Sequence, residues 1–300
     1  MAIAMLQRIY AMRAITPPQY LNEVQTRAVP ALLGMTHGDG GLGSWQGSGA
    51  TDADTVASII AASGVRTRPL KQARDWGYQR MTAGKLVLLA DAAPPPVARV
   101  TEAGCASTLA FELSDGPTRI IVNCGGAGLT GATIPAPLAR GLRTTAAHST
   151  LVLADSNSTA ILPDGTLGKG VTEVEIDRRE NEQGSRLEMS HDGYAKRHGL
   201  IHRRTLILPP SGRELRGEDV LLPAPRAKRR GDTGFALRFH LASGIEASLT
   251  ADGQGALLRI SGGPLWQFRT SGGVLSVEES LWVDGDGVPH PIEQLVVTDT

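Results

Sequence analysis

The spacing of apolar residues divides the chain into a helical beginning and a long remainder with the period of strands. In the first part, apolar side chains recur every three or four residues, as on a helix that buries one side. This spacing predicts one helix over residues 3–13, which Pro17-Pro18 ends, and a second helix from about Gln19 to Gly34. Two short helices cannot bury both of their faces, so we expect them to pack on the later sheets or to belong to a larger helical domain.

A glycine-rich connector follows the two helices. The segment from His37 to Gly47 reads HGDGGLGSWQG, and its glycines permit backbone shapes that other residues resist. After it, Thr51 and Asp54 have the spacing of a capping box, and the next apolar residues predict one short helix that ends at Gly64. Residues 35–75 are therefore expected to form a connector with a single helix.

Beyond the connector the helical period largely disappears, and short apolar runs predict strands. The expected strands cover residues 85–89, 108–113, 118–122, 150–153, 204–208, 235–241, 256–260 and 292–298. Asp-Gly pairs, which favour tight reversals between strands, begin at Asp39, Asp115, Asp164, Asp192, Asp252, Asp284 and Asp286. We therefore predict a mainly β fold, a large antiparallel β-sandwich over residues 76–300, preceded by the short helical segment.

The charge balance argues against several classes of partner. Lys plus Arg and Asp plus Glu number 30 each, so the formal net charge is +0 and no overall field attracts a polyanion. Nucleic acid and an anionic membrane surface are therefore poor candidates. The apolar runs are shorter than the roughly 18 residues that a membrane-spanning helix needs. The first apolar residues are interrupted by Gln7 and Arg8, so neither membrane insertion nor a secretion signal is expected.

Several short motifs in the β-rich part resemble, in their order, those of a known family. They are Phe111-Glu112-Leu113-Ser114-Asp115-Gly116, Val122-Asn123-Cys124-Gly125, Ala147-His148-Ser149-Thr150, His191-Asp192-Gly193-Tyr194 and His202-Arg203-Arg204. Over roughly residues 35–298 the chain resembles the C-terminal β-domain of the heparinase II/III-like polysaccharide lyases. Members of that family usually carry an α/α-toroid domain ahead of the sandwich. The resemblance implies that residues 1–34 are the last helices of such a toroid and that the chain is truncated relative to the family.

The activity that the resemblance implies is β-elimination on a polysaccharide that contains uronic acid. A base removes the proton beside the uronate carboxylate, an acid protonates the leaving oxygen, and cations or donors stabilise the intermediate. His148 matches the family's histidine at a strand start, and Arg143 is placed to pair with a uronate. Two alternatives stay open: His148 is bonded to the backbone at a sheet edge, and Arg143 is an ordinary surface residue.

Three further residues are candidates for binding the sugar. Tyr194 and His191 flank an Asp-Gly turn and could receive a sugar carboxylate, or they could serve only the turn. Trp45, in the glycine-rich connector, could stack on a sugar ring, or it could cover the junction between the helices and the sheets. The expected partner in either case is an acidic polysaccharide.

A structural zinc ion is a further implication of the resemblance, because some family members hold one with two His and one Asp. Cys105 stands where the first His is expected and Asn123 where the Asp is expected, with Cys124 beside it. The predicted ligand set is therefore Cys105, Cys124 and His148, since two thiolates and an imidazole can bind zinc. The alternatives are two ordinary buried thiols or a disulfide.

Two functions of different classes follow. The first is a polysaccharide lyase whose missing acid and base come from an upstream toroid domain or from another polypeptide, including a second copy of this chain. The second is a non-catalytic sandwich that binds glycan or serves in assembly. The resemblance implies a place in the cell envelope or periplasm, while the absence of a secretion signal leaves the cytoplasm open.

Overall fold

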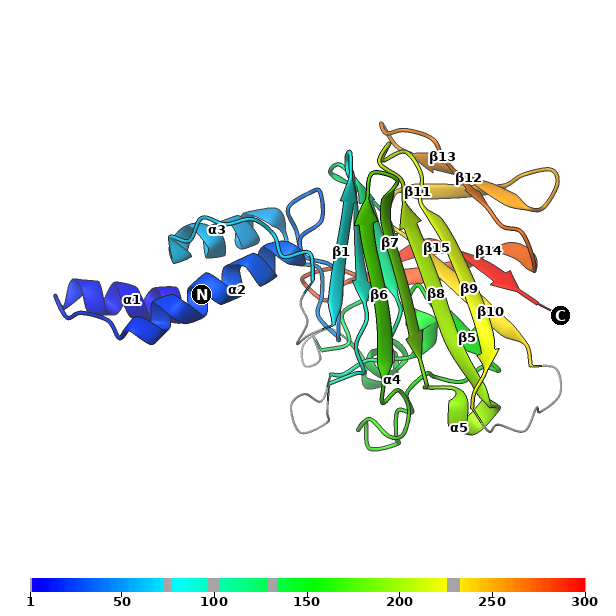
Figure 1. Cartoon of the computed structure of the whole chain (residues 1–300), viewed down its shortest axis with the longest axis horizontal. Coiled ribbons are helices and arrows are strands. Elements are labelled where there is room, and N and C mark those ends of the chain that lie inside the picture. Colours follow the sequence, from blue (N-terminus) through cyan, green and yellow to red (C-terminus); the bar gives the residue numbers. More distant parts are fainter. Residues whose placement is uncertain (1, 73–76, 97–102, 129–133, 226–232, 300) are drawn as a thin grey trace.

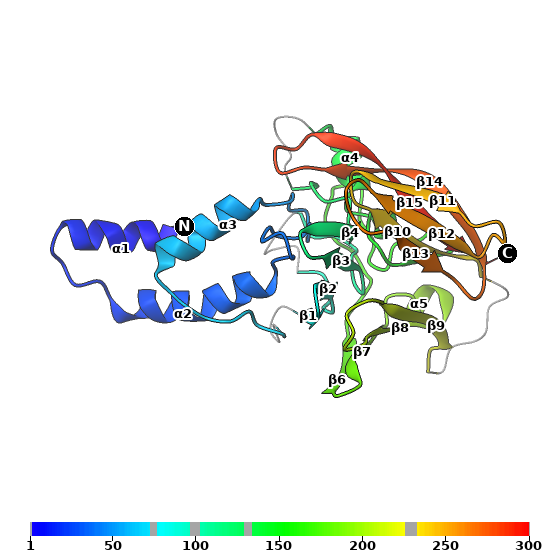
Figure 2. The ribbon, with the colours of Figure 1, turned by 90° about the horizontal axis from the view of Figure 1, so that it is seen from above.

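Three helices at the start of the chain form an arm that extends away from the β-sheets (Figures 1 and 2). The computed structural model describes residues 2–72, 77–96, 103–128, 134–225 and 233–299. The helices are α1 (Ala2–Met12), α2 (Gln19–Gly34) and α3 (Ala53–Ser63), which confirms the predicted helices. Within the described part of the chain, no helix is long and apolar enough to cross a membrane.

The start of α3 differs in one detail from the sequence prediction. The capping residue is Asp52, whose carboxylate accepts a hydrogen bond from the backbone N–H of Thr55 at 2.7 Å. Thr51 and Asp54 therefore do not form the predicted capping box. Asp52 satisfies the free N–H group directly, which is what an N-cap residue contributes.

The arm buries little of its own apolar surface. No residue of α1 is fully buried, and in α2 the buried side chains are few. Several large apolar side chains near the start of the chain are exposed, namely Met5, Leu6, Ile9, Met12, Ile15 and Tyr20. The helices pack mainly on one another, and the arm lies beside the sheets only at its base (Figure 2). The prediction that residues 1–34 belong to a toroid domain stays a prediction.

In the described part of the chain after the arm, the strands form three antiparallel sheets, which confirms the predicted mainly β fold with an antiparallel sandwich. The largest has the order β1-β2-β3-β4-β10-β15-β14, with β5 paired to β10; the second has the order β6-β7-β8-β9 and the third β11-β12-β13. Their bounds are β1 Tyr78–Ala83, β2 Leu86–Asp91, β3 Phe111–Asp115, β4 Thr118–Val122, β5 Leu151–Leu153, β6 Val174–Asn181, β7 Gly184–His191, β8 Leu200–Leu208, β9 Arg216–Pro223, β10 Phe235–Leu241, β11 Ile245–Leu249, β12 Gly255–Ile260, β13 Trp266–Arg269, β14 Val274–Val283 and β15 Pro289–Thr298. Short helical segments lie at Ala136–Gly141 (α4), Thr145–Ala147 (η1) and Ala195–His198 (α5).

The main apolar core lies between these sheets. It contains inward-facing side chains from all three sheets, among them Leu88, Leu113, Ile120, Leu187, Leu206, Phe239, Leu258 and Leu295. The rings of Phe111 and Phe239 meet edge to face at 6.1 Å between their centroids. The core therefore joins the sheets into one body and holds β3, β4 and β8 in fixed positions.

Candidate functional site

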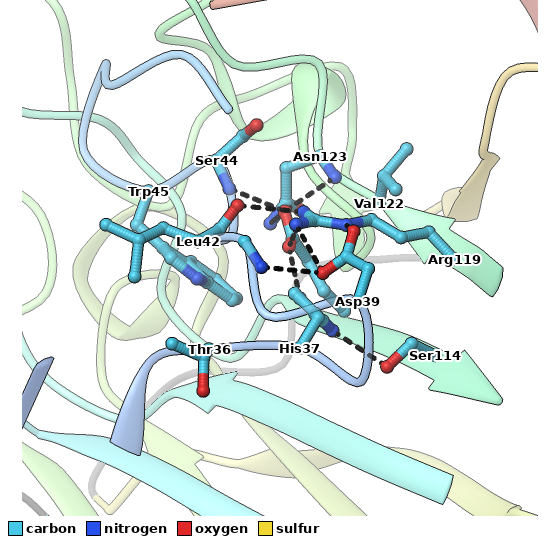
Figure 3. Close-up of polar contacts among 12 residues, drawn as sticks. Thr36, His37, Asp39, Leu42, Ser44, Trp45, Ser114, Arg119, Val122 and Asn123 are labelled. Atoms are coloured by element: carbon cyan, nitrogen blue, oxygen red, sulfur yellow. Dashed lines mark hydrogen bonds and ion pairs between the residues drawn. The ribbon is translucent and has the colours of Figure 1, made fainter. Parts of the chain in front are cut away.

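A buried polar cluster lies where the glycine-rich connector meets the large sheet (Figure 3). We call it the Glu112 cluster; its members are His37, Asp39, Glu112, Ser114, Arg119 and Asn123. Glu112 and Ser114 come from β3, Arg119 from β4, and Asn123 follows β4, while His37 and Asp39 come from the connector. The tight β3–β4 hairpin, in which Asp115 pairs with Thr118, places the three strand residues side by side.

Glu112 is the centre of this cluster and is fully buried. Its Oε2 lies 2.8 Å from His37 Nε2, and its Oε1 accepts hydrogen bonds from Ser44 N at 3.0 Å and from Asn123 N and Nδ2 at 3.1 Å. Burial raises the pKa of this carboxyl, but the hydrogen bond from His37, the charge of Arg119 and the hydrogen bond from Ser44 N together outweigh burial, so the pKa lies below its usual value. Glu112 is therefore an ionised group that no solvent reaches.

His37 is neutral in this arrangement. Burial lowers its pKa more than Glu112 raises it. Its Nε2–H donates to Glu112, and its Nδ1 accepts from the hydroxyl of Ser114 at 3.1 Å, while that hydroxyl oxygen accepts from Gly38 N at 3.2 Å. The connector is thus fixed to β3 by a chain of hydrogen bonds in which each donor has an acceptor.

Arg119 forms the outer part of the cluster. Its Nε and Nη2 donate to the two carboxylate oxygens of Asp39 at 2.8 and 3.2 Å, and its Nη1 donates to the carbonyl of Leu42 at 2.9 Å. Burial raises the pKa of Asp39, but the hydrogen bonds and charge of Arg119 lower it by more. The net pKa lies below the usual value, so Asp39 is ionised. This bidentate ion pair holds the connector in one position, and the guanidinium is bonded both to the Asp39 carboxylate and to the Leu42 carbonyl.

His148, the predicted catalytic residue, lies inside the protein between η1 and β5. Its side chain is 1% exposed, and its Nδ1 donates to the backbone carbonyl of Thr144 at 2.8 Å. Burial lowers its pKa to about 4, so the ring is neutral near neutral pH. This placement corresponds to the alternative of a histidine bonded to the backbone at a sheet edge.

Arg143, the other predicted catalytic residue, is also buried. Its Nε donates to the carbonyl of Gly104 at 2.8 Å, and its Nη1 donates to the carbonyl of Gly165. The guanidinium therefore joins three loop segments. It is therefore not the surface arginine of the sequence alternative, and its catalytic role stays a prediction.

Tyr194 and His191, the predicted sugar-binding pair, do lie together, with ring centroids 5.4 Å apart. Both are buried. The hydroxyl of Tyr194 donates to the carbonyl of Leu151 at 2.9 Å, and His191 Nδ1 accepts from Gly193 N at 3.0 Å. Burial raises the pKa of Tyr194 well above its usual value. The pair thus supports the turn that leads into α5, although His191 also contributes to the wall of a surface hollow.

His202 and Arg204 of the same region form a buried ion-pair network with Asp219. Asp219 Oδ1 lies 2.7 Å from His202 Nε2 and 2.8 Å from Arg204 Nε. Burial raises the pKa of Asp219, but Arg204 and His202 together lower it to about 2. Arg204 also donates to two backbone carbonyls, so this network joins β8 and β9 to the neighbouring loops.

Trp45 covers the junction between the arm and the sheets, as its structural alternative expected. Its side chain is 6% exposed and packs with Val87 and Leu89, and its ring meets Tyr78 edge to face at 5.4 Å. A ring that is covered on this scale has no free face on which a sugar can stack.

The two cysteines are free, so the disulfide alternative is wrong. Burial raises the pKa of both thiols to about 12, which keeps them protonated. Cys124 Sγ lies 3.7 Å from His240 Nδ1, whereas Cys105 Sγ is 3.3 Å from the carbonyl of Ala103. Across the described ranges, no three His, Cys, Asp or Glu side chains are grouped to hold a metal ion. Cys105, Cys124 and His148 are thus not brought into one ligand set, and zinc stays a prediction.

Sequence reasoning did not single out Glu112 or His240 as members of a site. His240 bonds to Ser280 Oγ at 2.8 Å and to the carbonyl of Ala146 at 3.0 Å, and burial lowers its pKa to about 3. Each is a polar side chain between two buried apolar neighbours, Phe111 and Leu113 in β3 for Glu112, and Phe239 and Leu241 in β10 for His240. A polar residue at such a position indicates a buried hydrogen bond, because polar side chains inside a core nearly always have a hydrogen-bond partner.

Among the described residues, three surface hollows can be compared by the charge of their linings. One of about 440 Å³ lies on the β6–β9 sheet and is lined by Arg203 and by the carboxylates of Glu173, Glu175, Asp177, Glu188 and Asp192. One of about 880 Å³ lies above the Glu112 cluster and is lined by Trp282, Arg119 and the carboxylates of Asp39, Asp52, Asp284 and Asp286. The third, of about 660 Å³, lies among hairpin tips and contains Lys85, Arg213 and Trp266 together with Asp115 and Glu214.

An arm of helices followed by stacked antiparallel sheets defines a class of large β-sandwich proteins, and comparison with known proteins identifies the family. The family model described as Heparinase II/III-like, C-terminal matches residues 65–300. The chain therefore belongs to the heparinase II/III-like family, through its C-terminal domain, and the resemblance inferred from the motifs is confirmed.

One curated relative and two solved structures show how similar this chain is to known proteins in sequence and in fold. FtsZ-localized protein C of Caulobacter vibrioides (strain NA1000 / CB15N) is 31% identical over 301 residues, which cover 92% of this chain and 49% of that protein. Heparan sulfate lyase HepC of Pedobacter heparinus superposes with a TM-score of 0.74 at 14% identity, over 99% of this chain and 47% of HepC. Heparinase III gives 0.76 at 12% identity, over 99% and 49%. These two structures establish the fold alone, and the chain spans about half the length of the proteins it matches.

Proposed function

We propose that this chain is a non-catalytic module of a heparinase II/III-like protein, which binds an acidic glycan and does not cleave it by itself. The observation that carries this proposal is the burial of His148. A base must come within hydrogen-bonding distance of the proton that it removes, and the His148 ring is enclosed with its Nδ1 bonded to Thr144.

The other candidate groups support the same proposal. Arg143 donates to backbone carbonyls of Gly104 and Gly165, and Tyr194 donates to that of Leu151. Each of these donors satisfies a backbone acceptor in the interior. Turning one of them toward a ligand would leave a buried carbonyl without its partner, at a cost of about 1–3 kcal/mol.

The test is to incubate the purified chain with heparan sulfate, hyaluronan and alginate in parallel, and to follow the ultraviolet absorbance of the unsaturated uronate product. A known heparin lyase serves as the positive control. We expect no product, together with measurable binding of at least one polymer by calorimetry. Product formation by this chain that His148→Ala abolishes would overturn the proposal, as would the absence of binding to all three polymers.

A lyase made by a longer polypeptide is the second candidate. The length comparison supports this candidate, because the chain spans about half the length of the proteins that it matches. In that case the acid and base come from residues outside this chain, such as a toroid domain. The same absorbance assay on a longer in-frame product, where the gene encodes one, separates this candidate from the first.

The curated relative also suggests a place of action. Since it carries the name FtsZ-localized protein C, we propose that the protein that contains this chain gathers at the site of FtsZ assembly. A fluorescent fusion should form a band with labelled FtsZ and should disperse when FtsZ is depleted. A signal spread evenly through the cell would contradict this proposal.

A further inference from the structure

Residues of four hairpin turns line the third hollow. We call it the hairpin-tip hollow; its lining comes from the β1–β2, β3–β4, β8–β9 and β12–β13 turns. The β1–β2 and β8–β9 turns lie at the upper end of the molecule in Figure 1. We propose that the hairpin-tip hollow binds one anionic sugar unit, whose carboxylate or sulfate is held by Lys85 and Arg213 and whose ring lies against Trp266. This inference rests on the proposed glycan-binding function and assigns it a site.

The side chains of the two cations in the hollow are available to bind a ligand. Lys85 and Arg213 are both exposed, and among the described residues neither side chain has a hydrogen bond or an ion pair. Their neighbour Glu214 pairs instead with Arg216, at 2.7 Å. With Arg216 counted beside the lining residues, three cations (Lys85, Arg213 and Arg216) outnumber the carboxylates of Asp115 and Glu214 by one, which leaves an excess of positive charge for a ligand.

The other two hollows have the opposite balance. Carboxylates outnumber cations around both of them, and Arg119 is already bonded to Asp39 and Leu42. An anionic ligand would meet like charges there, at a cost that grows as water is excluded. Charge therefore selects the hairpin-tip hollow among the three.

Close packing of two glycines fixes the relative position of the two turns that carry the cations. A Cβ on Gly212 would lie 2.2 Å from the carbonyl oxygen of Ala83, and a Cβ on Gly84 would lie 3.5 Å from Gly212 Cα. Gly212 also has a φ of +58°, which favours glycine. The β1–β2 and β8–β9 turns are thus in direct contact, so Lys85 and Arg213 project from two turns that support each other.

Trp266 supplies the apolar part of the proposed site. It begins β13, packs partly against the main core, and remains partly exposed in the hollow. Next to it, Leu265 is 63% exposed. An indole that is held by the core yet open on one side is a rigid surface, and binding sites use such side chains because little entropy is lost on contact.

Calorimetric titration with a heparan-sulfate hexasaccharide tests the proposal on the whole chain. We expect Lys85→Ala/Arg213→Ala to weaken binding roughly 10-fold, since two exposed charge contacts are removed. The matched control Arg68→Ala/Lys169→Ala removes the same charge from exposed positions elsewhere and should change the affinity less than about 2-fold. A hyaluronan hexasaccharide, which has carboxylates without sulfate, shows which anion is held.

The outcomes separate the two proposals. Wild-type binding that the Lys85→Ala/Arg213→Ala variant retains in full would overturn the hairpin-tip site and leave glycan binding intact. No binding by the wild-type chain would overturn the proposed function itself. Equal losses in the test and control variants would also overturn the site, because they would reflect net charge alone. Urea unfolding of each variant, which should match the wild type, verifies that the fold is kept.

Discussion

The Glu112 cluster and the hairpin-tip hollow use the same types of side chain in opposite ways. In the cluster, Glu112, His37 and Arg119 are engaged with partners from the connector and the sheet. In the hollow, the side chains of Lys85 and Arg213 have no hydrogen-bond or ion-pair partner among the described residues. The comparison teaches that the chemically reactive residue types of this chain are mostly used to hold its loops, while unused charge lies at turns.

The same contrast explains why a heparinase II/III-like fold does not by itself imply catalysis. His148, Arg143 and Tyr194 match what the chemistry requires in residue type, yet all three are bonded to backbone carbonyls. Function depends on which side chains reach a ligand and not on the fold. The four predictions below test both sides of this comparison.

The largest effect is expected for Glu112→Gln. This change removes the charge from an acceptor of four buried hydrogen bonds, and one hydrogen bond to a charged group typically contributes about 1.5–3 kcal/mol. The free energy of unfolding in urea should fall by this amount. The exposed residue Glu246 provides the control, and Glu246→Gln should change stability by less than about 0.5 kcal/mol. A loss below about 1 kcal/mol for Glu112→Gln would show that the cluster does not hold the connector.

The second effect concerns pH. The folded chain holds the pKa of His148 at about 4, below the ordinary value of 6.5, because of burial. Between these values the unfolded chain binds a proton that the folded chain does not, so stability falls as pH falls through this window. The loss from pH 7 to pH 5 is about 2 kcal/mol from this residue.

Urea unfolding of the wild type and of His148→Gln at both pH values measures this component. His240 also has a lowered pKa, mainly because of burial and partly because of the charge of His148, so the difference between the two chains reports His148 together with its effect on His240. The wild type should lose about 2 kcal/mol more than the variant between pH 7 and pH 5. Equal losses would mean that the ring is open to solvent.

The third effect is the stability of the variant that lacks the two cations of the hairpin-tip hollow. Lys85→Ala/Arg213→Ala should leave the free energy of unfolding within about 0.5 kcal/mol of the wild type, since exposed changes rarely affect stability. The loss of glycan affinity, roughly 10-fold, corresponds to about 1.4 kcal/mol. Strong destabilisation of this variant would show that the two cations are structural.

The smallest effect is the response to salt. Exposed charge contacts are screened with a Debye length of about 10 Å at 0.1 M salt, whereas buried pairs are screened much less. Raising the salt concentration should therefore weaken glycan binding a few-fold and should leave the cost of Glu112→Gln unchanged. Binding that is insensitive to salt would contradict a site built on Lys85 and Arg213.

The sequence predicted the fold better than the site for a physical reason. The period of apolar residues and the Asp-Gly pairs act locally, so helices α1 and α2 and strands β4 and β10 match their predicted ranges closely. Strand β6 was not predicted, because none of its residues is fully buried and its many charges hide the strand pattern. It is defined by its pairing with β7, which lies outside any local window.

The role of each site residue depends on burial, which one sequence does not give. His148 and Trp45 have the residue types of a sugar-binding site, and only the packing of distant strands makes them interior. Lys85 begins a predicted strand, and nothing near it in the sequence indicates a binding site. Its proposed role depends on Arg213, which lies in the same hollow but far away in the sequence. Glu112 was part of the family motif, but its partners lie in the connector.

The most direct test of this account is to titrate the heparan-sulfate hexasaccharide into His148→Gln and into Lys85→Ala/Arg213→Ala under identical conditions. The account predicts that His148→Gln binds within about 2-fold of the wild type and that the double variant binds roughly 10-fold more weakly. A reversed result, in which His148→Gln loses binding and the double variant keeps it, would contradict the account.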